Sequence, residues 1–395
     1  MTLSRAVGAG LLVGVLGWLV LWFQTEPRAN FDSLIYHTHA LEYAGLSRAD
    51  ADARSWEIYA RYADDRERTI IQDTMGDVPW STPISDRWMG LYQMRPLYPA
   101  LVAAGYPIGG FRAPMAVSAL VTIGYVVLTF VGMGLLVGYR AAAVATVAAL
   151  LQTNFTHWLV FLTTDGLAML LWAASITAIA LYVKTGRWGW LGAVLLAVLA
   201  LALTRPTGSL APIIPVICAV AALIARQPVW RRFAAAAVAA SVPAGAVVVG
   251  QAVLGFPGIA DVFQEIPTRH FALPDIADPI GYTIALNRWA IPDRLLPTLF
   301  SQPLLLASIV AGLAGLVIRG SWTSAPFLVA AVVVPVAWII HPVWFDAGRI
   351  LAPAWVSLNV GIGLLVDAGL SSQRERIMAF TEWATRPQPH PSIDR

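Results

Sequence analysis

The sequence predicts an all-α polytopic membrane protein with about ten transmembrane helices. Of its 395 residues, 58% are hydrophobic and 12% are charged, whereas soluble globular domains carry about twice that charged fraction. The hydrophobic residues gather in long stretches, and a helix needs roughly 20 apolar residues to cross the hydrocarbon core of a bilayer. Basic residues fall in alternate connections between these stretches, which is typical of multi-pass proteins with positively charged inner loops.

Ten apolar stretches are the candidate transmembrane helices. They cover residues 6–23, 113–138, 141–153, 158–183, 188–204, 207–225, 233–256, 296–318, 324–340 and 350–366. The block 141–183 is too long for one span, so we expect two spans joined by a tight outer turn at 154–158. Residues 96–111 are apolar but contain Pro99 and Pro107. We expect a re-entrant or interfacial piece there, with an eleventh span as the alternative.

The positive-inside rule gives this arrangement an orientation. With Arg5 inside, every inner connection and the tail are basic; they contain Arg140, Lys184, Arg187, Arg226, Arg231, Arg232, Arg319, Arg374 and Arg376. We therefore expect a plasma (inner) membrane protein with both termini in the cytoplasm. The first span should remain as an anchor, because it is longer than the apolar part of a signal peptide and bulky Trp18, Trp22 and Phe23 stand where small residues precede cleavage.

Two long loops then lie outside, at about 24–112 and 257–294. Residues 47–72 of the first loop interleave apolar and charged side chains, which predicts an amphipathic helix along the membrane surface. Residues 1–368 are expected to form one transmembrane domain. Residues 369–395 are expected to form a cytoplasmic tail that is disordered at its Pro-rich end.

Composition and spacing argue against several kinds of site. A single cysteine, Cys218, allows no disulfide framework and no cysteine metal site. The net charge of +3 indicates no nucleic-acid partner, and there is no glycine-rich nucleotide loop. His37 and His39 are two residues apart and fall on different faces of a helix, so they make a poor metal pair. We expect no cofactor and assign no metal ligands; a need for a divalent metal stays open.

Asp32 lies about nine residues after the first span, in Ala29-Asn30-Phe31-Asp32-Ser33-Leu34-Ile35-Tyr36-His37. A carboxylate at the outer surface can act as a general base toward a hydroxyl group. The alternative is a helix N-cap, because Asp32 immediately precedes a plausible helix at 33–43 and acidic side chains favour that position. The two roles are compatible.

Several short motifs share the outer side of the predicted membrane domain. Asp32 and Tyr36 are four residues apart, and Arg95-Pro96-Leu97-Tyr98-Pro99 precedes the second span. Later come Thr164-Asp165-Gly166, Leu203-Thr204-Arg205-Pro206 and Gly348-Arg349-Ile350-Leu351-Ala352-Pro353. In their order and shared side these motifs resemble the GT-C superfamily of multi-pass glycosyltransferases. The resemblance covers most of the membrane region, although each motif is short.

The resemblance implies a hexosyl- or pentosyltransferase similar to mannosyltransferases. Such an enzyme takes a sugar from a polyprenyl-phosphate carrier at the outer membrane face and passes it to a lipid, glycan or protein acceptor. It needs no nucleotide sugar and no redox cofactor. The family's catalytic base matches Asp32 here. Many relatives have a second acidic residue beside the first, whereas this chain has Ser33, which disfavours a metal mechanism based on an adjacent acidic pair.

Arg205, Arg349 and Arg95 are the candidate phosphate ligands. A lipid-linked phosphodiester is an anion at the interface, and the planar donor fork of arginine suits its oxygens. All three arginines lie near the outer ends of apolar segments. The alternative is that they reach outward to lipid headgroups.

Nine further residues are candidates for binding donor or acceptor: Tyr36, His37, Tyr98, Asp165, Arg269, His270, Arg288, His341 and Asp346. Asp165 is an acid close to the membrane interior, which is costly and usually requires a partner or a water-filled cavity. It is expected to bind a sugar hydroxyl or pair with an arginine, with helix anchoring as the alternative. For His341 and Asp346 the alternative is interfacial anchoring, and for the three residues of the second outer loop it is a solvated surface.

Two other functions compete with glycosyl transfer. A lipid or solute transporter would also carry charged residues in an apolar bundle, although transporters often show internal repeats and broken central helices, and neither is visible in this sequence. A catalytically silent relative that acts as an assembly partner is the second rival.

Overall fold

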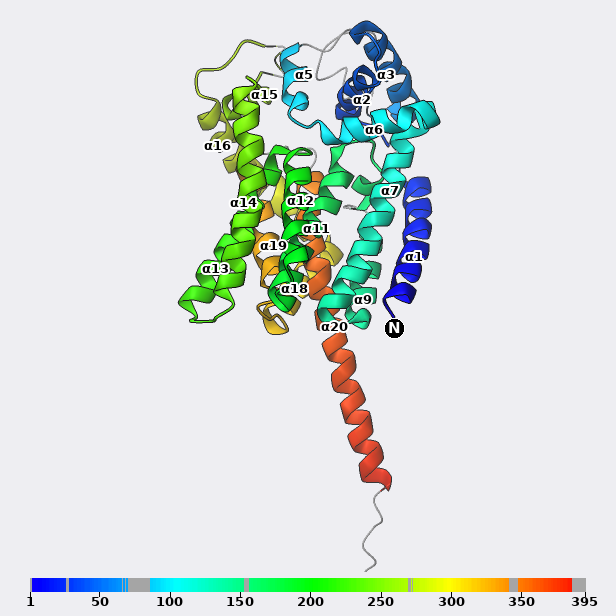
Figure 1. Cartoon of the computed structure of the whole chain (residues 1–395), viewed down its shortest axis with the longest axis vertical. Coiled ribbons are helices and arrows are strands. Elements are labelled where there is room, and N and C mark those ends of the chain that lie inside the picture. The colour runs from blue at the N-terminus through cyan, green and yellow to red at the C-terminus, as the bar shows by residue number, and fades with distance from the viewer. Residues whose placement is uncertain are drawn as a thin grey trace, which may run out of the picture.

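The computed structural model describes residues 2–25, 28–65, 67, 69, 86–152, 156–268, 271, 273–340 and 347–385. All regular secondary structure in these residues is helical (Figure 1). Within the described residues, six helical segments are long and apolar enough to cross a membrane, or seven if one bent pair of helices counts as a single span. The protein is therefore a membrane-embedded, multi-pass helical protein, and the count of about ten crossings stays a prediction.

The apolar helices form a bundle. The long segments are α1 (Leu3–Gln24), the run of α6 (Leu97–Gly109), α7 (Ala113–Val127) and α8 (Met133–Val137), α11 (Thr164–Thr185), α13 (Ile213–Ile224) with its preceding turn η4 (Pro206–Leu210), α14 (Trp230–Val253) and α20 (Ala347–Thr385). Shorter apolar helices are α9 (Tyr139–Leu151), α12 (Trp188–Ala202) and α19 (Ala325–Ile340). The predicted stretches therefore correspond to helices, but several of these are shorter than a full crossing.

The predicted span 296–318 is not one straight helix. The segment that ends with α17 (Leu296–Ser301) meets α18 (Pro303–Ile318) at a bend of 91°. Gln302 adopts non-helical dihedral angles, and Pro303 starts the next helix because proline fits a first turn but cannot donate a helical hydrogen bond. Hydropathy alone could not reveal this bend, because apolar content is similar on both sides of it.

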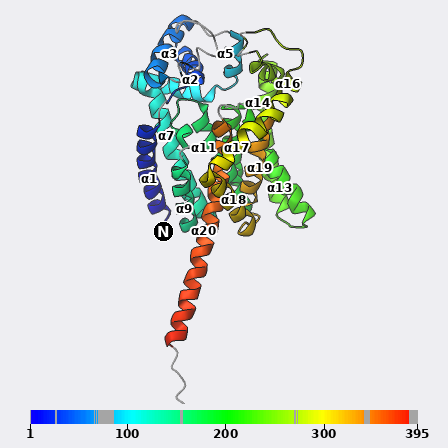
Figure 2. The same cartoon turned by 180° about the vertical axis from the view of Figure 1, so that it is seen from behind.

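A second group of helices forms a cap on one end of the bundle. The cap consists of α2 (Phe31–Tyr43), α3 (Arg48–Tyr62), α5 (Asp86–Gln93), α15 (Ile259–Glu265) and α16 (Pro279–Ala290). The start of α1 and the end of α20 lie at the opposite end of the molecule (Figures 1 and 2). Helix α6 packs against both α2 and α7 and so joins the cap to the bundle.

Basic residues at the end opposite the cap bind helix carboxyl ends. Lys184 Nζ donates to the carbonyls of Leu135 and Leu136, both at 2.8 Å, and Arg232 Nη1 donates to the carbonyl of Val183 at 2.6 Å. The last carbonyls of a helix lack partners within the helix and carry partial negative charge, so cations stabilise them. These contacts bring three of the predicted basic connections to the same end of the bundle.

Small residues let α20 pack closely inside the bundle. Gly312 and Gly315 of α18 lie directly against the backbone of Leu358 and Gly361 in α20, with no space for side chains at either glycine. Glycine is enriched at helix contacts in membranes for this reason, because dispersion contacts between close backbones drive association where water is absent. Helix α20 continues to Thr385, so part of the predicted tail is helical; its predicted disordered end lies outside the described residues.

One boundary predicted from the sequence is wrong, and one amphipathic segment packs differently from the prediction. The span expected at 158–183 begins at Thr164, because residues 158–163 form the turn η3 (His157–Leu159) and a buried loop. The amide of Leu162 donates to the carbonyl of Arg28 at 2.9 Å, so the backbone of this apolar loop finds a hydrogen-bond partner within the protein. The amphipathic segment also differs from prediction: α3 packs its apolar face, which includes Ile58 and Tyr59, inside the cap rather than leaving it for lipid.

Candidate functional site

Asn30, and not Asp32, is the N-cap of α2. The Asn30 side chain accepts from the amide of Ser33 at 3.3 Å, and Ser33 Oγ accepts from the amide of Asn30 at 3.1 Å, which completes a capping box. The prediction that Asp32 caps a helix starting at Ser33 is therefore wrong by two residues. Asp32 sits in the first turn, where the positive end of the helix dipole stabilises a carboxylate.

Asp32 is partly exposed and is held by a tyrosine from another cap helix. Tyr92 Oη, at the end of α5, donates to Asp32 Oδ1 at 2.5 Å. Burial, together with the negative charge of Asp32, raises the pKa of Tyr92 well above its ordinary value. The phenol therefore stays protonated at neutral pH and fixes one carboxylate oxygen. Nothing in the sequence singled out Tyr92, since it lies in a short helix with no motif.

A chain of hydrogen bonds leads from the cap into the bundle. Arg95 Nη1 donates to Tyr36 Oη at 2.8 Å, and Thr164 Oγ1 donates to the same oxygen at 3.1 Å. Arg205 Nε in turn donates to Thr164 Oγ1 at 3.4 Å. The guanidinium carbon of Arg95 also lies 4.8 Å from the centre of the Tyr92 ring. These contacts connect both described candidate arginines to the Asp32 region.

Arg205 forms a buried ion pair with Asp165. The distance from Arg205 Nη2 to Asp165 Oδ1 is 2.6 Å, and the two side chains are 14% and 1% exposed. Thr163 Oγ1 donates to the other carboxylate oxygen at 2.7 Å. Arg205 thus turns into the protein, which contradicts the alternative of reaching to lipid headgroups. Of the roles considered for Asp165, pairing with an arginine is the one that the geometry supports.

Two glycines allow the close backbone contacts that position Asp165 and Arg205. A Cβ on Gly166, in the first turn of α11, would meet the carbonyl oxygen of Leu159 at 2.9 Å. A Cβ on Gly208, just after Arg205, would meet the backbone of Leu201 at 2.7 Å. Both values are closer than real Cβ contacts allow, so glycine lets the loops approach. Gly166 lies in the motif that begins with Thr164, whereas Gly208 lies two residues after the motif that begins with Leu203.

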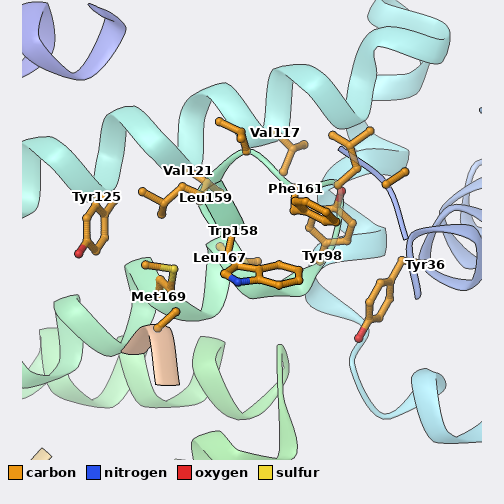
Figure 3. Packing of buried hydrophobic residues seen from close by; sticks show 14 of the residues in the cluster. Tyr36, Tyr98, Val117, Val121, Tyr125, Trp158, Leu159, Phe161, Leu167 and Met169 are labelled. Carbon is orange, nitrogen blue, oxygen red and sulfur yellow. The ribbon is translucent and has the colours of Figure 1, made fainter. Parts of the chain in front are cut away.

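Aromatic rings line the apolar side of this cluster. The Tyr36 ring lies 5.1 Å from the Tyr92 ring and 5.8 Å from the Tyr98 ring, each edge to face. Figure 3 shows Tyr36 and Tyr98 in the same packed group as Trp158 and Phe161, whose rings are 4.6 Å apart. Tyr98 Oη has no hydrogen-bond partner among the described residues. Its hydroxyl is buried within the packed group.

The remaining candidates are two described side chains, His37 and Arg288, and five whose side chains the structure does not describe. His37 is buried, and neither ring nitrogen has a hydrogen-bond partner within the described part of the chain. Burial lowers its pKa to about 3, so the ring is neutral. Arg288 is exposed on α16. Arg349 is in the first turn of α20, but its side chain lies outside the described residues, as do Arg269, His270, His341 and Asp346 altogether.

Besides Tyr92, three polar side chains of the cluster are not among the predicted site residues, although Thr164 belongs to a quoted motif. Thr163 and Thr164 orient the ion pair and Tyr36, as described above. Glu265, at the end of α15, is 9% exposed and interacts electrostatically with Tyr92 and Arg95. Across the described residues, no three or more His, Cys, Asp or Glu side chains are grouped so as to hold a metal ion.

No protein-family profile matches this chain, and no curated protein matches it.

Proposed function

We propose that the protein is a glycosyltransferase that moves a sugar from a polyprenyl-phosphate donor to a lipid, glycan or protein acceptor at the outer face of the membrane. The observation that carries the proposal is one contiguous polar cluster at the cap end of the bundle. It contains a partly exposed carboxylate, Asp32, held by a protonated tyrosine. In the same cluster Arg95 and Arg205 are joined through Tyr36 and Thr164.

In the proposed reaction the acceptor hydroxyl oxygen attacks the anomeric carbon of the donor sugar. The bond between that carbon and the phosphate oxygen breaks, and its electron pair leaves with the polyprenyl phosphate. Asp32 takes the proton of the hydroxyl group as general base. A single displacement of this kind inverts the configuration at the anomeric carbon.

Arg95 and Arg205 are proposed to hold the departing phosphate. Guanidinium groups stabilise negative charge that develops on a leaving group, above all where the surroundings exclude water. Asp165 and Thr164 keep Arg205 in place before the donor arrives, which lowers the cost of organising the site. Arg349 is retained as a third phosphate ligand on the basis of its motif alone.

The proposed orientation places the cap outside the cell and both termini in the cytoplasm. Its support is the basic end of the bundle, where Lys184 and Arg232 bind helix carboxyl ends opposite the cap. Cytoplasmic connections of membrane proteins are enriched in Lys and Arg. The site then meets the outer interface, where a lipid-linked donor would present its sugar.

The direct test is transfer from a synthetic polyprenyl-phosphate sugar by purified protein in liposomes. Asp32→Asn removes the base and keeps the shape of the side chain, so we expect turnover to fall by about 100-fold or more. Asp293→Asn is the matched control, because Asp293 is an exposed carboxylate of the second outer loop; its turnover should stay within about twofold of the wild type. Near-normal transfer by the Asp32 variant would remove Asp32 from the mechanism.

The same preparation separates the two rival functions. The buried pair of Asp165 and Arg205 near the end of two apolar helices would also suit a transporter. Movement of a lipid or solute across the liposome membrane without any sugar transfer would favour that function. Binding of the donor with no turnover for any sugar would favour a catalytically silent assembly partner.

A further inference from the structure

The second outer loop closes onto the part of the cap that carries Tyr92. Helix α15 packs against α5, and Gly90 gives Pro257 the room to approach, since a Cβ there would lie 3.1 Å from the proline ring. Gln251 Nε2, near the end of α14, donates to the carbonyl of Met94 at 2.9 Å. These contacts hold the chain before Tyr92 against the start of the second loop and the chain after it against the end of α14.

Arg87, at the surface of α5, binds side chains of the second outer loop. Arg87 donates to both carboxylate oxygens of Asp275, at 2.7 and 2.9 Å, and to Asp261 Oδ1 at 3.2 Å. Its guanidinium carbon also lies 4.3 Å from the centre of the Phe271 ring. Single exposed ion pairs contribute little, but a bidentate arginine with a second carboxylate and an aromatic ring fixes a geometry. Arg87 therefore sets how α15 sits on α5.

This arrangement turns one face of α15 inward. Val262 packs against the hydrophobic cluster that contains Tyr92 and Met94. Glu265 is three residues further along and so shares that face. Its residual exposure of 9% is low for a carboxylate, which requires positive charge or hydrogen-bond donors nearby. Arg95 is a buried cation close enough to interact electrostatically with this carboxylate.

We propose that Glu265 is a positioning residue of the site, delivered by the second outer loop, whose carboxylate balances the buried charge of Arg95 and so keeps that guanidinium group beside Tyr36 and the Tyr92 ring. Glu265 does not touch the reacting atoms. The expected effect of Glu265 on catalysis rests on the proposed glycosyl transfer, whereas its electrostatic effect on Tyr92 does not. The two are therefore tested separately.

The first experiment titrates Tyr92 without using any activity. A polyfluorinated tyrosine, whose phenol ionises at accessible pH, is placed at position 92 and followed by fluorine NMR. The groups that act on this phenol are Asp32, Glu265, Arg95 and Tyr36. Because a neighbouring negative charge raises a phenol pKa, Glu265→Gln should lower the midpoint by about one pH unit. Glu265→Asp should leave it near the wild-type value.

Asp293→Asn is again the control, because it removes an exposed carboxylate of the same loop and should not move the midpoint. If Glu265→Gln does not fold, Arg87→Ala offers a surface change that loosens the loop and should move the midpoint in the same direction. An unchanged midpoint in the folded Gln variant, or an equal shift in the control, overturns the positioning role.

The second experiment measures transfer from the synthetic donor. Glu265→Gln should raise the donor KM by about tenfold with a smaller change in kcat, because it disturbs how Arg95 is held rather than the base, and Glu265→Asp should recover most of the loss. Equal losses in the Gln and Asp variants would contradict positioning through charge. If wild-type protein transfers no sugar, the proposed function fails, and the NMR titration still decides the role of Glu265.

Discussion

The contact between Asp32 and Tyr92 depends on which residue caps α2. Asn30 takes the cap and Ser33 completes it, so the Asp32 carboxylate is not used to satisfy the first amides of the helix. It can then point at Tyr92 from the adjacent short helix. Replacing Asn30 would therefore alter the site indirectly. If Asp32 became the new N-cap, its carboxylate would bind the first amides of α2 and would no longer accept from Tyr92.

His37 makes the stability of the cap depend on pH. Its pKa is about 3 in the folded protein because burial disfavours the imidazolium ion, against an ordinary value of 6.5. The unfolded chain binds a proton below about pH 6.5 while the folded protein does not, so stability is full above that pH and falls as pH drops toward 3. The loss from this group amounts to about 1.4 kcal/mol per pH unit in that range.

His37→Phe should remove this dependence. Phenylalanine has a similar shape and no ring nitrogens that need partners, so the variant should unfold at higher temperature than the wild type at pH 5 and show a shallower fall between pH 6.5 and 4. Thermal unfolding in detergent across this range measures it. Identical acid dependence in the two proteins would show that His37 is not buried in neutral form.

At the scale of the element, the start of α11 depends on close backbone contact. Gly166 is in the first turn, and the loop that ends at Thr163 passes directly over it. Because alanine would collide with the Leu159 carbonyl, either the loop or the helix must move. Asp165 lies one residue away and would move with the helix, which would lengthen its contact with Arg205.

Gly166→Ala should therefore lower stability by about 1–3 kcal/mol and reduce transfer. Gly192→Ala, in α12, is the matched control: a Cβ there meets nothing within 4 Å. Alanine at such a helical site should stabilise by about 0.5–1 kcal/mol. Thermal unfolding of both variants gives the comparison. Opposite signs are expected, and a loss of similar size at both positions would contradict the steric argument.

The sequence predicts the elements of this fold better than their ends. Apolar stretches and basic connections identify α1, α12 and α14 within a few residues. The composition of segment 158–163 predicts a helix, because an apolar loop buried in protein has the same composition as a helix facing lipid. Only its contact with the carbonyl of Arg28 distinguishes the two, and such a contact is made by distant parts of the chain.

The residues of the candidate site likewise divide into those that the sequence predicts and those that it does not. Six of its residues lie in short motifs and are brought together by the fold: Asp32, Tyr36, Arg95, Tyr98, Asp165 and Arg205. Tyr92 and Glu265 were missed, since each is a single polar residue in a short helix. No spacing rule connects them to Asp32; the packing of α15 on α5 does.

At the scale of the whole molecule, the orientation can be tested with single cysteines. Cys218 is the only cysteine of the sequence and is buried, so a Cys218→Ala protein gives a silent background. Glu57→Cys reports on the cap and Gln227→Cys on the connection between α13 and α14; both positions are exposed. In intact cells a membrane-impermeant maleimide should label the first and spare the second, and permeabilised cells should show both labelled.

The reverse pattern would place the cap and the candidate site in the cytoplasm. Labelling of both positions in intact cells would contradict the arrangement in which they lie at opposite ends of the bundle (Figure 1). Either outcome would also contradict the proposal that the sugar donor binds at the outer face of the membrane. Transfer activity in sealed vesicles of known sidedness gives an independent measure of the same property.

The ion pair between Asp165 and Arg205 has a consequence for biosynthesis. The acid starts α11 and the arginine follows α12, so both charges belong to one helical hairpin of neighbouring, packed helices. The charges can therefore neutralise each other while the hairpin enters the bilayer, before the later helices have been translated. Loss of either partner would leave an isolated charge during insertion. Such variants should be made in low yield even where the finished protein could tolerate them.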